Sequence, residues 1–135
     1  MAETLTTWSP SCNVSVNVQL SGEATTSDAG ALLLREALDC SGAIEVMEEH
    51  LVDPRDPLRV RHSLASQLRA VVLQRAMGWY DLNDTCTLCQ DPLWQLACSD
   101  ARSLTPLNEA RPSQATLSRL LTCLARILHR ADQRR

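Results

Sequence analysis

The sequence has no lysine, only four glycines and no long apolar run. No segment approaches the roughly 18 consecutive apolar residues that a membrane-spanning helix needs, so we expect no membrane contact. The four glycines are scattered along the chain, which excludes a glycine-rich loop that would cradle a nucleotide phosphate. The first ten residues contain one acidic and no basic side chain. This argues against a secretory signal and predicts a cytoplasmic location.

The composition is typical of one small globular domain. The chain has 135 residues, of which 44% are hydrophobic and 21% charged. Residues 1–57 contain ten acidic and two basic side chains, whereas residues 58–135 contain six acidic and eleven basic ones. All the basic side chains are arginine, whose planar guanidinium binds phosphate in a bidentate manner. This asymmetry fits a protein that holds nucleic acid at one end only. A GC-rich genome is an alternative explanation of the all-arginine composition that involves no function.

The apolar pattern predicts a mainly α fold, a small multi-helix domain with a short N-terminal β element. Residues 1–12 are expected to form a loose N-terminus and residues 13–135 the helical domain. Val14, Val16 and Val18 alternate with polar residues, which predicts a strand. A strand needs a partner, and we expect either a second short strand near residues 23–25 or an element outside the chain.

Helix boundaries are predicted from residues that cap or interrupt helices. A serine, asparagine or aspartate before an apolar stripe accepts hydrogen bonds from the first turn, and a glycine often follows the last turn. Helix starts are predicted at Ser27, Ser63, Asn83 or Asp84, Asp91 and Ser113, and interruptions or ends at Gly42 and Gly78.

The spacing of apolar residues predicts which helix faces are buried. Arg69 and Arg75 fall off the stripe of their helix and should therefore be exposed. The stripes expected to face the core are Leu33, Leu34, Ala37 and Leu38 in the first helix, Leu64, Leu68, Val71 and Val72 after Ser63, and Leu117, Leu120, Leu121, Leu124, Ile127 and Leu128 in the last helix.

Cys86 and Cys89 form a CxxC motif, which could supply half of a zinc site. The other cysteines and histidines do not form a second pair at short spacing. Zinc binding and redox chemistry are therefore minor alternatives, and we interpret most of the six cysteines as reduced core residues. Glu45, Glu48 and Glu49 could share a helix face and bind a metal, but a solvated acidic face is favoured. We predict no metal site, no cofactor and no catalytic residue.

Two groups of polar residues are candidates for DNA contact. Arginines cluster before and along the helix that follows Ser63, and polar side chains occupy the first turns of the last helix, which suits reading of a DNA groove. A solvated or salt-bridged face is an equally good interpretation of the arginines. The predicted DNA-binding residues are Arg59, Arg61, Arg69, Arg75, Gln114, Ser118 and Arg119.

Several segments together resemble, in order and spacing, the N-terminal region of bacterial insertion-sequence transposases with a DDE core, in the DDE domain group 1 branch. Two departures are Ala115, where proline is usual, and the residues after Arg119, where an acidic residue and an asparagine commonly follow. The resembling segments are residues 26–30 with 33–36, 53–57 with 61–63, 78–81 with 83–84, 91–92, and 113–119.

The resemblance implies that the three catalytic carboxylates of the family belong to an RNase H-like core downstream of this region. There, Mg²⁺ ions activate water or a 3′-hydroxyl for attack on a phosphodiester. It implies a fragment truncated before that core, not catalytic by itself, with Mg²⁺ expected only for the missing core. Asp81, Asp84 and Asp91 match short segments that are usual in the N-terminal region of the family, and they do not match its catalytic triad.

The implied partner is DNA, at the terminal inverted repeats of the mobile element, with self-association as a further option. The alternatives are a helical protein–protein interaction or oligomerisation module and a remnant without function.

Overall fold

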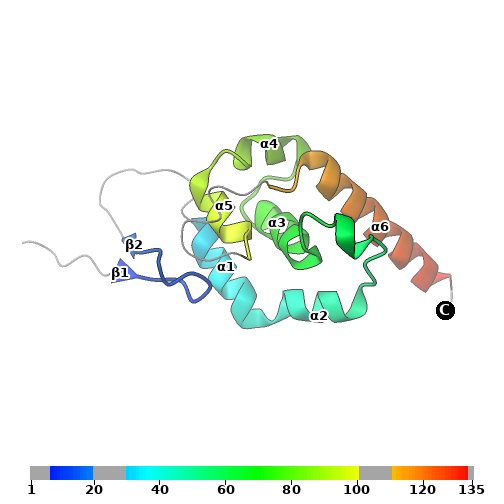
Figure 1. Ribbon diagram of the computed structural model, residues 1–135, viewed down its shortest axis with the longest axis horizontal. Helices are drawn as coiled ribbons and strands as arrows, with labels where there is room; N and C mark the ends of the chain where they lie inside the picture. The colour runs from blue at the N-terminus through cyan, green and yellow to red at the C-terminus, as the bar shows by residue number, and fades with distance from the viewer. Residues whose placement is uncertain (1–6, 20–29, 101–110, 134–135) are drawn as a thin grey trace, which may run out of the picture.

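A computed structural model describes residues 7–19, 30–100 and 111–133. In these residues it contains six α-helices, two 3₁₀ helices and a two-stranded antiparallel sheet (Figure 1), which confirms the mainly α fold. The expected cap at Ser27 and the expected strand near residues 23–25 lie outside the described residues. The helices are α1 (Gly30–Ser41), α2 (Ala43–His50), η2 (Pro57–Arg59), α3 (Leu64–Ala76), η3 (Leu82–Asp84), α4 (Thr85–Leu88), α5 (Pro92–Cys98) and α6 (Gln114–Asp132).

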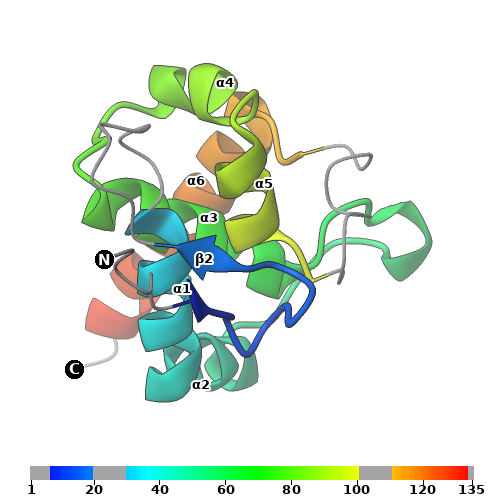
Figure 2. The same ribbon diagram turned by 90° about the vertical axis from the view of Figure 1, so that its left-hand side faces the viewer.

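The N-terminal β element is a short hairpin in which β1 (Thr7–Trp8) pairs with β2 (Val18–Gln19), and Trp8 lies opposite Val18. The predicted strand is wrong at its start, because Val14 and Ser15 lie in a turn where the Asn13 side chain accepts a hydrogen bond from the Ser15 N–H. The strand that pairs with β2 is β1, which lies upstream of it in the sequence. The hairpin sits beside α1 and α5 (Figure 2).

Residues 7–12 are not loose, in contrast to the expectation from the sequence. The backbone N–H and hydroxyl of Ser11 both donate to Glu36 Oε2 on α1, at 2.8 and 2.9 Å. Trp8 also packs against the core.

The core forms around α3, which is central in the domain and contacts α1, α2, α5 and α6. Each neighbouring helix contributes an apolar side chain to this core, and α4 adds Leu88. The largest fully buried apolar side chains are Trp94, Leu32, Ile44, Leu73, Leu88 and Leu117.

Local capping chemistry starts the helices where the sequence predicts. Ser63 Oγ accepts from the Ser66 N–H at 2.9 Å, and Ser113 Oγ accepts from the Thr116 N–H at 3.4 Å. Asp91 Oδ1 accepts from two N–H groups of α5, at 2.7 and 3.1 Å. These three predicted caps are confirmed.

The glycine positions are confirmed, and one cap is corrected. Gly42 and Gly78 have φ values of 65° and 88°, the left-handed conformation that favours glycine between and after helices. Asp84 stands at the N-cap position of α4, as one of the two predictions has it, but its side chain makes no capping hydrogen bond. Asp81 instead caps the preceding η3, because its Oδ1 accepts from the Asn83 N–H at 2.9 Å.

The predicted buried face of α1 is rotated in the structure. Ala31 and Leu32 are buried, whereas Leu33 is 55% exposed and Leu34 and Leu38 are only partly buried. Arg35 is also buried, because its Nη1 donates to the carbonyl oxygens of residues 97 and 99 at 2.7 and 3.0 Å. The guanidinium thereby satisfies carbonyls at the C-terminal end of α5.

The prediction that Arg69 is exposed is wrong, whereas Arg75 is exposed as expected. Arg69 is 6% exposed because α3 is surrounded by other helices, so almost every side of it faces protein. Its Nη1 lies 2.5 Å from Asp100 Oδ1, and its Nε lies 3.8 Å from Asp39 Oδ1. Asp39 Oδ2 also accepts from Arg35 Nε at 2.7 Å, so one ionic network links α1, α3 and the end of α5.

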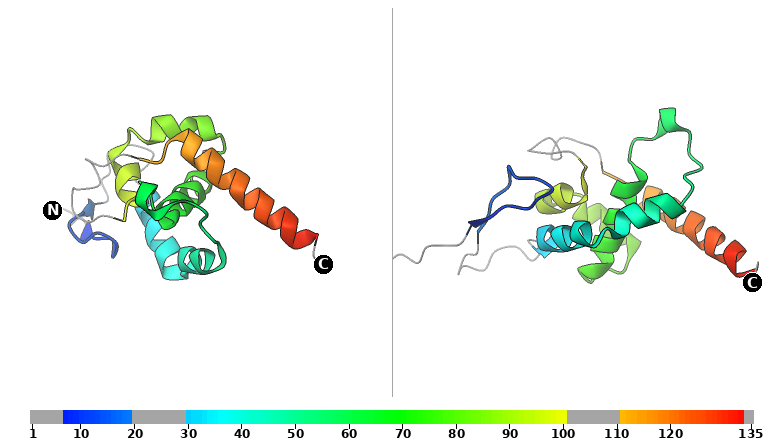
Figure 3. Two further views of the ribbon diagram at one scale, coloured as in Figure 1. Left: turned by 45° about the vertical axis from the view of Figure 1, so that its right-hand side comes forward. Right: turned by 90° about the horizontal axis from the view of Figure 1, so that it is seen from below.

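The leucine stripe of α6 is only partly covered. Leu117 and Leu120 are buried, Leu121 and Leu124 pack partly against the core, and Leu128 is 70% exposed. Figure 3 shows the reason, since the C-terminal part of α6 extends beyond the body of the domain.

The six cysteines are all free thiols, but most do not belong to the core. Only Cys98 is buried, whereas Cys40 and Cys86 are exposed, so the interpretation as core residues is wrong for most of them. Burial raises the pKa of the Cys98 thiol strongly. In the part of the chain that the structure describes, no helix is long and apolar enough to cross a membrane.

Candidate nucleic-acid interface

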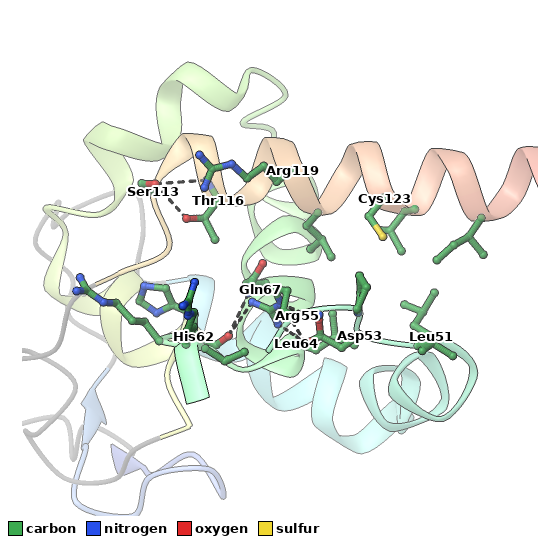
Figure 4. Close-up of a pocket in the computed structure, with 18 of the residues that line it drawn as sticks. Leu51, Asp53, Arg55, His62, Leu64, Gln67, Ser113, Thr116, Arg119 and Cys123 are labelled. Atoms are coloured by element: carbon green, nitrogen blue, oxygen red, sulfur yellow. Dashed lines mark hydrogen bonds and ion pairs between the residues drawn. The ribbon is translucent and has the colours of Figure 1, made fainter. Parts of the chain in front are cut away.

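A groove lies between α6 and the loop that joins α2 to α3, with a cavity volume of about 630 Å³. One wall consists of residues 51–55 and 59–62 of the loop, together with Leu64 and Gln67 of α3. The opposite wall is one face of α6 and the residues just before it (Figure 4). The loop stands out from the body of the domain in the right-hand view of Figure 3.

Arg55 holds the loop wall in place. Its Nε and Nη2 donate to the two carboxylate oxygens of Asp53, at 2.7 and 2.5 Å, and its Nη1 donates to the carbonyl oxygen of His62 at 3.1 Å. The hydrogen bond from Arg55 is the largest influence on Asp53 and holds the pKa of that carboxyl below its ordinary value. Gln67 of α3 donates to the same His62 carbonyl at 3.1 Å, so both ends of the loop are fixed.

The N-terminal end of α6 is fixed by side-chain contacts as well. Ser113 caps the helix, and Gln114 Nε2 donates to Asn83 Oδ1 of η3 at 2.9 Å. The uncapped N–H groups of this first turn and the helix dipole make this end of the groove favourable for an anion.

The two ends of the groove differ in chemistry. Both walls contribute arginines, namely Arg59 and Arg61 of the loop and Arg111 and Arg119 of the α6 wall, and Arg119 lies toward the end marked by Ser113. Among the described residues, the one acidic side chain in the lining is Asp53, which is paired with Arg55. In Figure 4, His62 and Ser113 lie at one end and Leu51 and Cys123 at the other. The apolar lining comes from Leu51, Val52, Val60, Leu64, Leu120, Leu124 and Ile127.

Three of the seven predicted DNA-binding residues come together at this groove. Arg59, Arg61 and Arg119 line it, although they are far apart in the sequence. Arg59 is strongly exposed, and its Nε lies 3.7 Å from Asp56 Oδ2 at the surface. The groove thus brings arginines from two separate segments of the chain to one surface.

The other four predicted residues lie elsewhere. Arg69 is buried in the ionic network, and the amide of Gln114 is hydrogen-bonded to Asn83. Arg75 and Ser118 are exposed but do not line the groove.

Two arginines of the groove were not among the predicted residues. Arg111 lines the α6 wall, and its Nη2 donates to Gln95 Oε1 at 3.1 Å. Its position two residues before the Ser113 cap repeats the arrangement of Arg61 before Ser63, a pattern that the sequence contains. Arg55 positions the loop, and the sequence signal for this was its neighbour Asp53.

The aspartates in the segments that resemble the transposase family have structural roles. Asp81 and Asp91 cap helices, Asp56 accepts from the Leu58 N–H to start η2, and Asp53 pairs with Arg55. Among the described residues, no three His, Cys, Asp or Glu side chains are grouped so that they could hold a metal ion. These carboxylates therefore serve the fold of the domain.

The sequence matches the family Transposase DDE domain group 1 over residues 9–134. The match spans most of the chain, and the chain belongs to this family of DDE transposases. Its function is therefore related to DNA transposition. No curated protein and no solved structure matches the chain.

Proposed function

We propose that this chain is the DNA-binding N-terminal part of a bacterial insertion-sequence transposase, and that the basic end of the groove holds the DNA backbone. The observation that carries the proposal is the convergence of Arg59, Arg61 and Arg119 from two walls onto one groove. Membership of a DDE transposase family supports DNA as the partner. The implied location is the cytoplasm, where bacterial DNA is found.

The chemistry of this end suits phosphate better than base edges. Guanidinium groups from opposite walls can each donate two hydrogen bonds to phosphate oxygens, and the N-terminus of α6 adds a favourable dipole. Gln114, the best candidate for reading a base, is already hydrogen-bonded to Asn83. We therefore propose that the groove positions DNA through its backbone, and that contacts of this kind supply most of the affinity.

We further propose that this chain does not cut DNA by itself and that a catalytic core outside these residues supplies the catalytic carboxylates. The capping roles of Asp56, Asp81 and Asp91 support this, because a carboxylate that accepts backbone hydrogen bonds at a helix start is committed to the fold. Incubation of the chain and labelled duplex DNA with Mg²⁺ or Mn²⁺ should leave the duplex intact. Strand nicking or joining by the purified chain would contradict this part of the proposal.

DNA binding is tested by a mobility-shift assay on duplex DNA across a series of salt concentrations. Arg61→Gln and Arg119→Gln should each weaken binding and reduce the slope of log affinity against log salt by about 1, the effect of losing one phosphate contact. Arg75→Gln is the matched control, because it removes the same charge from an exposed arginine outside the groove. Arg75 lies about 12 Å along α3 from the groove-lining Gln67, at a rise of about 1.5 Å per residue.

Two results would contradict the proposed interface. If wild-type binding does not depend on salt, backbone contacts do not drive it. If Arg75→Gln reduces the slope as much as the groove variants do, the groove is not the binding surface. Duplexes with and without the terminal inverted repeats of the element then distinguish specific from general DNA binding.

Self-association is a second candidate function. It is favoured by the apolar end of the groove and by Leu128, which is 70% exposed on the part of α6 that extends from the domain. An exposed apolar patch of this kind is typical of a protein–protein contact.

A further inference from the structure

The apolar end of the groove has no use in binding a DNA backbone. Leu51, Val52, Leu124 and Ile127 line it, and sugar–phosphate groups offer such side chains little to bury against. Unpaired bases would stack on aromatic side chains, but the described lining contains no Phe, Tyr or Trp, and its one imidazole, His62, lies at the other end of the groove. The chemistry of this end therefore fits an apolar protein segment.

The charge beside this apolar surface restricts which protein segment can bind. Arg126 and Arg130 are exposed on α6, and their spacing from Arg119 places the three arginines on one side of the helix. Within the described residues, no ion pair involves any of these three arginines. Two α6 helices packed side by side would bring these positive charges together, which is unfavourable, so an acidic segment fits better.

The chain itself carries a segment of this kind in α2. Glu45 and Glu49 are exposed on this helix, and among the described residues neither carboxylate forms an ion pair. Between them, Val46 is 56% exposed and Met47 37% exposed. The third glutamate, Glu48, is engaged within the domain, because its Oε1 accepts from the N–H of residue 65 at 3.1 Å.

We propose that α2 of a second copy of this chain docks at the apolar end of the groove. Val46 and Met47 of one copy contact the apolar lining of the other, and Glu45 and Glu49 face Arg126 and Arg130. Met47 suits this role because its flexible side chain adapts to an irregular surface. The pairing joins the acidic first half of one chain to the basic second half of the other.

The geometry allows this contact to form twice in one dimer. The chain leaves α2 at His50 and enters the groove wall at Leu51, so the acidic helix and the groove adjoin on the same molecule. A two-fold axis can therefore place each α2 against the α6 of its partner, which closes the assembly at two copies. The basic end of each groove, with Arg61 and Arg119, stays open.

This inference rests on the second candidate function, self-association, and does not depend on DNA binding. It is tested on the full chain by sedimentation velocity over a dilution series, with circular dichroism to check folding. Glu45→Arg/Glu49→Arg and Arg126→Glu/Arg130→Glu should each weaken the dimer by about tenfold or more, because each variant opposes like charges. An equimolar mixture of the two variants should restore the dimer, because both contacts of the mixed dimer then join opposite charges.

Two controls keep the test interpretable. Arg75→Glu reverses an exposed charge outside both surfaces and should leave the dimer unchanged. Glu49→Arg alone is the fallback if the double α2 variant fails to fold, because a positive charge near the C-terminus of α2 suits the helix dipole.

The outcomes distinguish the interface from self-association in general. A chain that stays monomeric at every concentration overturns self-association itself. A dimer that is insensitive to the α2 variant, or that tightens in Arg126→Glu/Arg130→Glu, overturns the α2–α6 pairing and leaves another interface. Failure of the mixed variants to associate also overturns the pairing.

Discussion

Replacement of Arg69 by methionine tests whether this arginine serves the fold and not DNA. Methionine has similar length and fills the same buried space, so the change removes the charge with little loss of packing. In the structure, Arg69 Nη1 makes a 2.5 Å charge-assisted hydrogen bond to Asp100, whose other oxygen accepts from Ser63 Oγ at 2.6 Å. Asp39 would keep its 2.7 Å contact with Arg35.

The expected loss is about 1–2 kcal/mol in the free energy of unfolding. A hydrogen bond to a charged group contributes about 1.5–3 kcal/mol. Two features reduce that value here. The side chain of Asp100 is 48% exposed, so water partly replaces the lost contact, and the buried Nε of Arg69 has no hydrogen-bond partner, so its removal relieves a desolvation cost.

The effect should depend on pH in a defined direction. Partial burial alone would raise the pKa of Asp100, but the hydrogen bonds from Ser63 and Arg69 and the nearby arginine charges outweigh it and hold the pKa below its ordinary value of 3.8. A carboxyl with a lowered pKa stabilises the fold above that value and loses this contribution as the pH falls through the folded-state pKa. The difference between wild type and Arg69→Met should therefore be full at pH 7 and shrink below pH 3.8.

Urea unfolding at several pH values measures this difference, and an unchanged dependence on urea concentration shows that the unfolded state is comparable. A variant as stable as wild type at pH 7 would refute the proposed balance. A difference that persists unchanged in acid would show that Asp100 is not the partner that matters. In the mobility-shift assay, Arg69→Met should keep the wild-type salt slope, and a slope reduced by about 1 would instead make Arg69 a phosphate contact.

Two further predictions concern a helix cap and a buried thiol. Asp91→Ala should reduce the free energy of unfolding by about 1 kcal/mol, because two N–H groups of α5 lose their acceptor, whereas Asp91→Asn should keep most of the stability. Equal urea midpoints for the two variants would contradict the capping role. In native protein, iodoacetamide should modify the exposed Cys40 and Cys86, and Cys98 should react only after unfolding, because burial both shields its thiol and raises its pKa. Peptide mass spectrometry reads the labels, and native labelling of Cys98 at the rate of Cys40 would contradict its placement.

The sequence by itself determined the starts and ends of most helices. Ser63, Asp91 and Ser113 cap helices as predicted, and Gly42 and Gly78 adopt the left-handed conformation expected after helical segments. These features are local, because a cap bonds to N–H groups two or three residues away, so no knowledge of the rest of the fold is needed. The family was recognisable for a related reason, because the segments that resemble it are the same short capping and turn segments.

Burial was harder to predict, because it depends on how many neighbours a helix has. The stripe of α3 correctly placed Leu68 and Val71 in the core, but it treated the helix as if only one face were covered. Since α3 is surrounded, Arg69 is buried as well and needs Asp100 and Asp39 as partners. For α1, the same limitation rotated the predicted face and left Arg35 unrecognised as a buried residue.

The grouping of the arginines was decided by tertiary structure alone. Arg61 and Arg119 are 58 positions apart in the sequence, and no local pattern relates them. They line one groove because the hydrogen bonds of Arg55 to Asp53 and to the His62 carbonyl hold the loop wall in place. The contact of Gln114 with Asn83 fixes the start of α6. The sequence determined which arginines are available, and long-range packing determined which of them line the same groove.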